Sequence, residues 1–169
     1  SLLPPTLSEE EYIERNIEAL RDSEDKEHGG FGAAPKTAHW DAISFLLRAA
    51  DARRDDGLRA LAVRATAAAL ALQDSVDGGF FRFALEPDWT KPRYERLLDE
   101  QAKALSILTR VYRATGEERF RKAADRVAGF VGKFLHTRVP GRGAEPGGLG
   151  WYHSVRPDVR RRDGSWMAG

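Results

Sequence analysis

The chain has 169 residues, of which 41% are hydrophobic and 31% charged, and its formal net charge is only +1. This composition excludes an intrinsically disordered chain, because disordered chains combine few apolar residues with a high net charge. The near-neutral balance argues against a nucleic-acid partner, and no apolar run approaches the roughly 18 residues of a membrane-spanning helix, so no membrane partner is expected.

Several residue patterns that carry chemistry are missing from the chain, which contains no cysteine. Disulfides, thiol nucleophiles and thiolate metal sites are therefore excluded. The four histidines show no HxxxH or HxH spacing, so neither a metal nor another cofactor is predicted. The first residues lack the layout of a signal peptide, and a cytoplasmic location is expected.

The first predicted element is a helix over about 9–23, which Ser8 and Glu11 begin with the spacing of a capping box. We divide the chain into an N-terminal helix and linker (1–24), two helical hairpins (25–155) and an Arg-rich tail (156–169) that looks truncated. The arginines of this tail favour a solvated segment over an anion-binding patch.

A glycine-glycine-apolar signal occurs three times, at 29–32, 78–81 and 147–150. Between consecutive signals lie two helical patterns with a glycine turn at their break. The patterns cover 37–54 and 58–75, broken at 55–57, and then 92–114 and 118–137, broken at 115–117. Glycine suits such breaks because helices commonly end in a left-handed residue. The chain is therefore an imperfect repeat of a glycine-aromatic loop followed by a helical hairpin.

Apolar residues within each helical pattern follow the i, i+3, i+4, i+7 spacing of one helix face. The four stripes are Ile43, Leu46, Leu47 and Ala50; Leu58, Leu61, Ala62, Ala65, Ala69 and Leu72; Leu98, Gln101, Leu105, Leu108 and Tyr112; and Phe120, Ala123, Ala124, Val127, Val131 and Phe134. Strand signals are confined to 80–85 and 149–155, so the predicted class is all-α.

Helical hairpins that are apolar on two sides need neighbours, which predicts a layered ring or a solenoid. The hairpins of this chain are too few to close a ring. Further chain of a longer parent protein, a second copy through self-association, or an open bundle would each cover the exposed faces.

Two segments carry a family resemblance. Residues 29–36, GGFGAAPK, resemble a "GGFGxAPKF" motif, and 78–102 resemble "GGGFHRY…W…PHFEKMLYDNA". Both motifs are found in the thioredoxin-domain-containing proteins of the spermatogenesis-associated protein 20 type. The resemblance implies an (α/α)6 toroid similar to N-acylglucosamine 2-epimerases and six-hairpin glycosidases, of which this chain would be the early part. The thioredoxin-like domain of the family is absent from this sequence, so no redox function is carried over.

The chain departs from the family motifs at residues that could transfer protons. Phe81 and Arg93 stand where the motifs have histidine, and Asp99-Glu100-Gln101 replaces "YDN". Imidazole transfers protons near neutral pH, whereas arginine stays charged. If those histidines are catalytic in relatives, this chain has kept the scaffold without the chemistry.

Glu95 and His28 are the candidate catalytic residues. Glu95 and Asp99 lie four residues apart in the third helical pattern, where paired carboxylates would resemble an acid/base pair of sugar chemistry. A salt-bridged helix face with Lys103, or a substrate-orienting role for Glu95, are the alternatives. His28 precedes the first glycine pair and could carry protons at a loop mouth.

The candidate substrate-binding residues are aromatic or basic and lie in or beside the glycine loops. They are Phe31, Phe80, Arg82, Trp89, Arg93, Tyr94 and Trp151. Aromatic rings stack on apolar sugar faces, and arginines bind carboxylates or phosphates. Packing in the core and structural ion pairs are the alternative roles.

Three functions follow from these patterns. The first is a non-catalytic cleft with a binding or scaffold role, with a small carbohydrate as its partner. The second is an epimerase- or glycosidase-like enzyme that uses Glu95, and the third is an assembly segment that dimerises through its open hairpin faces. The lost histidines favour the first over the second.

Overall fold

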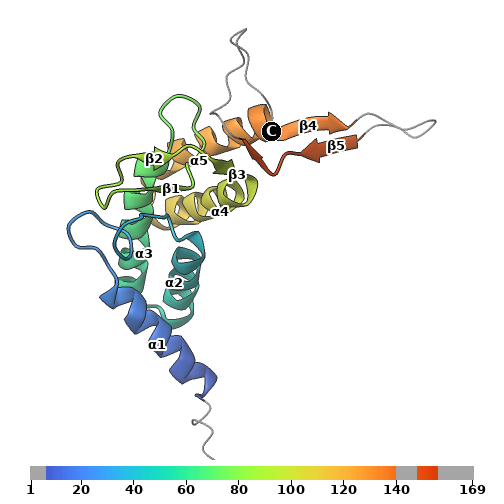
Figure 1. The fold of residues 1–169 in the computed structure, drawn as a ribbon. Coiled ribbons are helices and arrows are strands. Elements are labelled where there is room, and N and C mark those ends of the chain that lie inside the picture. Colours follow the sequence, from blue (N-terminus) through green and yellow to red (C-terminus); the bar gives the residue numbers. More distant parts are fainter. Residues whose placement is uncertain (1–6, 140–147, 156–169) are drawn as a thin grey trace, which may run out of the picture.

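The computed structural model describes residues 7–139 and 148–155, whose regular structure is predominantly helical (Figure 1). The helices are α1 (Glu9–Asp22), α2 (Trp40–Arg53), α3 (Asp56–Ala69), α4 (Leu98–Thr115) and α5 (Glu118–Phe130), with a 3-10 turn η1 (Leu70–Leu72) and a π-helical turn η2 (Val131–Leu135). The strands are β1 (Phe83–Ala84), β2 (Pro92–Arg93), β3 (Arg96–Leu97), β4 (His136–Val139), β5 (Gly148–Trp151) and β6 (Ser154–Val155). The predicted all-α class with short strand pieces is confirmed.

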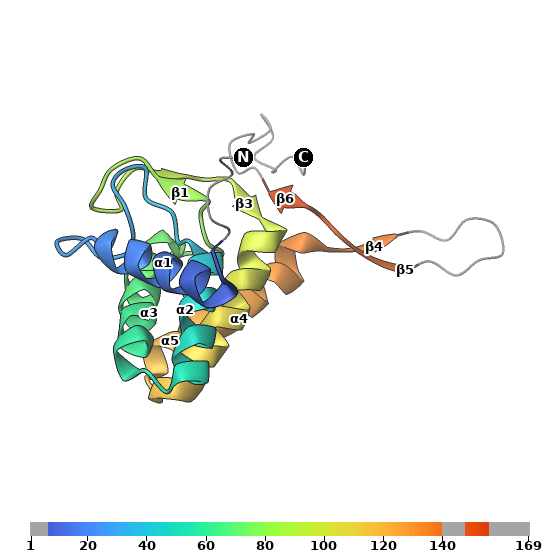
Figure 2. The same cartoon turned by 90° about the horizontal axis from the view of Figure 1, so that it is seen from below.

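The helices form two hairpins, as the sequence predicts. Helix α2 packs on α3 and α4 packs on α5, while α2 and α4 also contact each other (Figures 1 and 2). Helix α1 lies beside the turn of the first hairpin, where Arg53 bonds Glu10 at 2.8 Å. The predicted capping box at its start is present, because the Ser8 hydroxyl accepts from the Glu11 amide and the Glu11 carboxylate accepts from the Ser8 amide.

The first two predicted stripes are buried in full, and they form the centre of the core. The fourth stripe fails only at its end. Phe134 is exposed, whereas Leu135 is completely buried. The π-helical turn over Val131–Leu135 explains the difference, since its wider turn shifts the side chains that follow it relative to α-helical spacing.

The two helix breaks have different causes. Helix α4 ends at Gly116 with φ 71°, as predicted for a left-handed glycine. The break between α2 and α3 lies at Arg54, which is itself left-handed with φ 54°, and Gly57 belongs to the first turn of α3. Asp55 then begins α3, because its carboxylate accepts from the Leu58 amide at 3.0 Å. The prediction of a glycine turn at the first break was therefore wrong.

The predicted helix over 92–114 begins six residues later than expected. Pro92 and Arg93 form β2 against β1, and Arg96 and Leu97 form β3 against β6. These partners lie elsewhere in the chain, so helical periodicity alone could not reveal them. Glu95 precedes α4, and the prediction that it shares a helix face with Asp99 was wrong.

The end of the helix predicted over 118–137 was also wrong, because His136 and Thr137 belong to β4, which pairs with β5.

The first two glycine loops have the same backbone structure. In loop 1 the Asp25 amide donates to the Gly30 carbonyl at 3.0 Å and the Gly29 amide donates to the Asp25 carbonyl at 3.0 Å. In loop 2 the corresponding bonds, Asp74 to Gly79 and Gly78 to Asp74, measure 2.9 and 3.1 Å. The glycine loops predicted as a repeat from the sequence thus form the same backbone hydrogen bonds. We define loop 1 as residues 25–32 and loop 2 as residues 74–81.

The third glycine signal and the Arg-rich tail, both predicted from the sequence, fall partly or wholly outside the described residues. Gly147 of the third glycine signal lies outside the described residues, while Gly148–Trp151 forms β5. The predicted tail at 156–169 lies outside them entirely. None of the helices in the described ranges combines the length and apolar character needed to cross a membrane.

Candidate functional site

A cavity of about 400 Å³ lies where α2 and α4 begin. Its wall combines residues from the segment before α2, the first turn of α2, β1 and the first turn of α4. The lining residues are Pro35, Thr37, His39, Trp40, Asp41, Ala42, Arg82, Phe83 and Glu100.

Local structure explains how these residues meet. The segment before α2 is tied to β1, because the Lys36 amide donates to the Ala84 carbonyl at 2.8 Å and the Ala84 amide donates to the Lys36 carbonyl at 2.9 Å. His39 precedes α2 in a left-handed conformation with φ 50°. A left-handed backbone at a residue other than glycine is strained, and such residues cluster at functional sites.

Glu100 is the acid of this cavity. Its carboxylate forms no ion pair and no side-chain hydrogen bond with any residue that the structure describes, because the nearby Lys103 bonds Asp41 at 2.8 Å. Burial raises the pKa of Glu100, and the charges of Asp99 and Asp41 raise it further, against the opposing effect of Lys103 and Arg82. Glu100 therefore keeps its proton to a higher pH than an ordinary glutamate.

His39 shifts in the opposite direction. His39 is exposed as a residue, but desolvation of part of its ring lowers its pKa, and the charge of Lys36 lowers it further. Its imidazole is therefore neutral near pH 7. The ring of Phe31 meets it edge-on, with 6.3 Å between the ring centres.

Arg82 lines the cavity and is the one predicted substrate-binding residue among the cavity's lining residues. Its guanidinium bonds the Glu95 carboxylate at 3.0 Å, and its amide donates to the Glu95 carbonyl at 3.0 Å. Glu95 is itself absent from the lining, so it contacts the cavity wall through Arg82. This ion pair is one of the alternatives that the sequence left open.

The structure places the predicted aromatic residues in two other environments. Phe31, Phe80 and Trp89 are core residues. The Phe80 ring packs edge-on against Trp40 with ring centres 5.2 Å apart, and so supports a residue of the cavity wall. A direct role of these three rings in binding stays a prediction.

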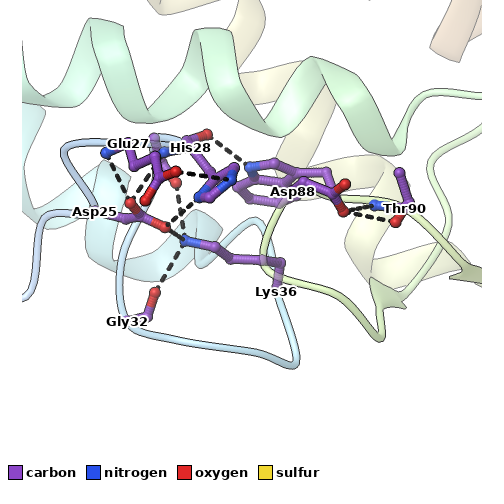
Figure 3. Close-up of polar contacts among 9 residues, drawn as sticks. Asp25, Glu27, His28, Gly32, Lys36, Asp88 and Thr90 are labelled. Atoms are coloured by element: carbon purple, nitrogen blue, oxygen red, sulfur yellow. Dashed lines mark hydrogen bonds and ion pairs between the residues drawn. The ribbon is translucent and has the colours of Figure 1, made fainter.

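The remaining predicted residues are more exposed and do not line the cavity. Tyr94 packs edge-on against Phe81, and Trp151 packs against His136, with ring centres 5.2 and 5.1 Å apart. Arg93 lies exposed in β2. His28 lies in loop 1, where its amide donates to Asp25 and its Nδ1 lies 3.7 Å from Asp25 Oδ2 (Figure 3).

Sequence reasoning missed His39 and Glu100. A signal for Glu100 was available, because Glu100 occupies the place of the acid in the "YDN" part of the family motif. Its neighbour Gln101 has a structural role instead. Gln101 is fully buried, accepts from the Phe80 amide at 2.7 Å and donates to the Phe80 carbonyl at 2.9 Å. No sequence pattern pointed to His39.

Within the described ranges, no group of three or more histidine, cysteine or acidic side chains is arranged to hold a metal ion.

No protein-family model matches the chain. Spermatogenesis-associated protein 20 from mouse is 29% identical over 133 residues, which cover 75% of this chain, and the human protein is 28% identical over 145 residues, which cover 82%. The chain is related to spermatogenesis-associated protein 20. It spans 17% and 18% of the lengths of these mouse and human relatives, and the resemblance read from the two motifs is confirmed.

Solved structures show which fold this relative of spermatogenesis-associated protein 20 adopts. Cellobiose 2-epimerase from Bacillus thermoamylovorans B4167 superposes with a TM-score of 0.67 at 17% identity, over 95% of this chain and 42% of that one. Cellobiose 2-epimerase from Spirochaeta thermophila gives a TM-score of 0.65 at 22% identity, over 92% and 41%. A sugar epimerase from a ruminal bacterium gives 0.57 at 19% identity, over 83% and 35%. The chain therefore has the fold of part of an (α/α)6 toroid, as predicted.

Proposed function

We propose that the cavity binds a small neutral carbohydrate, and that the chain supplies part of a binding or scaffold cleft. The observation that carries this proposal is Glu100, a half-buried acid at the cavity that has no partner among the described residues. The volume of about 400 Å³ falls within the range of small-molecule sites. The solved neighbours that share the fold are named as sugar epimerases.

The chemistry of the wall suits a neutral polyol. Each sugar hydroxyl both donates and accepts a hydrogen bond. Glu100 can do the same when it is protonated, a form that its raised pKa extends to higher pH, and Thr37 adds a second group of this kind. The rings of Trp40 and Phe83 offer apolar surface for the face of a sugar. An anionic ligand would meet the carboxylate of Asp41, while Arg82 is already paired with Glu95.

Proton transfer is the second candidate function, favoured by the opposite pKa shifts of His39 and Glu100. An imidazole with a lowered pKa and a carboxyl with a raised pKa are groups of the kind that form an acid/base pair. This version of the enzyme hypothesis uses Glu100 and His39 in place of Glu95 and His28.

Replacing Glu100 with alanine is expected to weaken cellobiose binding about two- to tenfold, because a hydrogen bond between neutral groups contributes roughly 0.5–1.5 kcal/mol. Glu100→Gln, which keeps the shape and a hydrogen-bond donor, is expected to retain affinity within about threefold. Calorimetric titration with cellobiose measures both, and Glu118→Gln on α5 is the matched control. Equal affinities of Glu100→Ala and the unchanged chain would contradict the proposal.

The pH dependence separates the protonated form from the charged one. Because the pKa of Glu100 is raised, its protonated form persists above the usual range of a glutamate and is lost as pH rises through the shifted value. As the pH rises through that value, cellobiose affinity should fall in the unchanged chain and stay constant in Glu100→Gln.

The enzyme alternative predicts that deuterium from D₂O enters a carbon-bound position of the sugar. Glu100→Gln should abolish this incorporation. If Glu95→Gln alone abolished it, Glu95 would be favoured as the catalytic residue.

A further inference from the structure

Lys36 is a charged residue in the core of the chain, with an exposed fraction of 0%. Its ammonium has three acceptors, all in loop 1. They are Asp25 Oδ2 at 2.5 Å, the Gly29 carbonyl at 3.0 Å and the Gly32 carbonyl at 2.9 Å (Figure 3). The three donors of the ammonium are thus fully used, and none is available to a ligand.

The backbone of Lys36 joins two parts of the cavity wall. Its amide and carbonyl both pair with Ala84, so the segment 35–37 lies against β1. Pro35 and Thr37, on either side of Lys36, line one part of the cavity, while Phe83, next to Ala84, lines another. Lys36 therefore ties loop 1 to two parts of the wall without contributing its own side chain to the lining.

Loop 2 is held by an equivalent cation, Arg96 of β3, which serves as an internal comparison. Arg96 is nearly buried and bonds Asp74, the counterpart of Asp25, as well as Asp77 at 3.1 Å. Its guanidinium lies 4.8 Å from the ring centre of Phe81. Arg96 is absent from the cavity lining. In both loops a buried cation thus bonds the first aspartate of the loop. Of the two cations, Lys36 is flanked by residues that line the cavity.

We propose that Lys36 is the positioning residue of the cavity, because its buried ammonium holds loop 1 and its backbone fixes two parts of the cavity wall. A buried ion pair contributes little net stability compared with apolar residues of the same volume, because desolvation offsets the attraction. A lysine at this position is therefore explained by geometry and charge better than by stability alone. The link to ligand binding rests on the proposed function, whereas the link to His39 does not.

The groups around His39 allow the effect of Lys36 to be separated. Partial burial and the Lys36 ammonium both lower the pKa of His39. Asp41 on α2 and Arg82 and Glu100 across the cavity are the other charged or titratable residues of the wall. Asp41 is paired with Lys103 and Arg82 with Glu95, and Lys36 is the charge that lowers the pKa of His39.

The test is the titration of His39, followed by NMR on its ring resonances and assigned with His39→Gln. In Lys36→Met the midpoint should rise towards, without reaching, the value of about 6.5 of a free histidine, because burial remains. Lys36→Arg restores a charge and should restore the low midpoint. Arg96→Met, the matched control at the cation that bonds loop 2, should lower the denaturation midpoint but leave the His39 titration unchanged. An unchanged midpoint in Lys36→Met, or an equal rise in Arg96→Met, would overturn the proposal.

Lys36→Gln keeps the proposal testable if Lys36→Met does not fold. The glutamine amide can still donate hydrogen bonds to loop 1, but it carries no charge. The His39 midpoint should rise in Lys36→Gln as it is expected to rise in Lys36→Met, and an unchanged midpoint in Lys36→Gln would overturn the proposal.

Cellobiose affinity distinguishes this proposal from the proposed function. In folded variants, Lys36→Met should weaken binding at least tenfold, while Arg96→Met should change it less than about threefold. Equal weakening in both variants would overturn the positioning role. If the unchanged chain fails to bind cellobiose, the proposed function loses its support, and the His39 titration still decides whether Lys36 acts on that residue.

Discussion

Replacing Trp89 with alanine is expected to lower the free energy of unfolding by about 3–5 kcal/mol. The side chain is only 7% exposed, and its indole nitrogen donates to the His28 carbonyl at 2.9 Å. Its ring also covers Gly30, where an added Cβ would lie 2.7 Å from the indole. The substitution would leave a void and an unpaired carbonyl between loop 1 and the segment before α4. Urea denaturation measures the loss.

Trp151→Ala is the control for this prediction, because Trp151 is 55% exposed. Its loss is expected to stay below about 1 kcal/mol, as is usual for exposed positions. The sequence pattern also allowed Trp89 to be a sugar platform. A Trp89→Ala variant of normal stability that had lost only carbohydrate binding would support a sugar-binding role of Trp89 and contradict its role in the core.

Gly78→Ala is expected to lower the free energy of unfolding by about 2–5 kcal/mol, from a left-handed backbone and a steric clash together. Gly78 has φ 88°, and an added Cβ would lie 2.8 Å from both the Cβ and the carbonyl oxygen of Arg126 on α5. Relief would require loop 2 to move away from that helix. Chemical denaturation of the purified variant gives the loss directly.

Gly116→Ala separates the two contributions. Gly116 is also left-handed, with φ 71°, but no atom lies within 4 Å of an added Cβ. Its loss should therefore be confined to the backbone contribution of about 1–2 kcal/mol. If the two alanine variants were equally stable, close packing of loop 2 on α5 would play no part.

The helical hairpins could be predicted because their information is local. The stripe from Ile43 to Ala50 and the stripe from Leu58 to Leu72 follow helical spacing, and all their members are buried. The glycine loops could be predicted as a repeat for the same reason. Ser8 and Glu11 likewise form their capping box within four residues.

The errors fall where distant partners decide the backbone. Arg93 pairs with Phe83 and Arg96 with Val155, so the segment before α4 is extended despite its helical composition. At the end of the second hairpin, the π-helical turn exposes Phe134 and buries Leu135. Neither outcome is encoded in a period of 3.6 residues.

The cavity shows the same division. Arg82 was identified because it lies in a recognisable loop motif, whereas His39 depends on the fold to bring α2 beside β1 and α4. Glu100 occupies the place of the acid in the family motif. The predicted pairing of Glu95 with Asp99 instead assumed a helix that includes Glu95, and the helix begins only at Leu98. The structure shows which of these neighbouring acids lines the cavity.

An amide chemical-shift map of the chain during titration with cellobiose tests most directly whether the cavity is the carbohydrate site. We predict that the perturbed amides cluster at residues 37–42, at Arg82 and Phe83, and around Glu100, with little change at Tyr94 or Trp151. Saturable changes confined to Tyr94, Trp151 and their neighbours, with none around Glu100, would contradict the account.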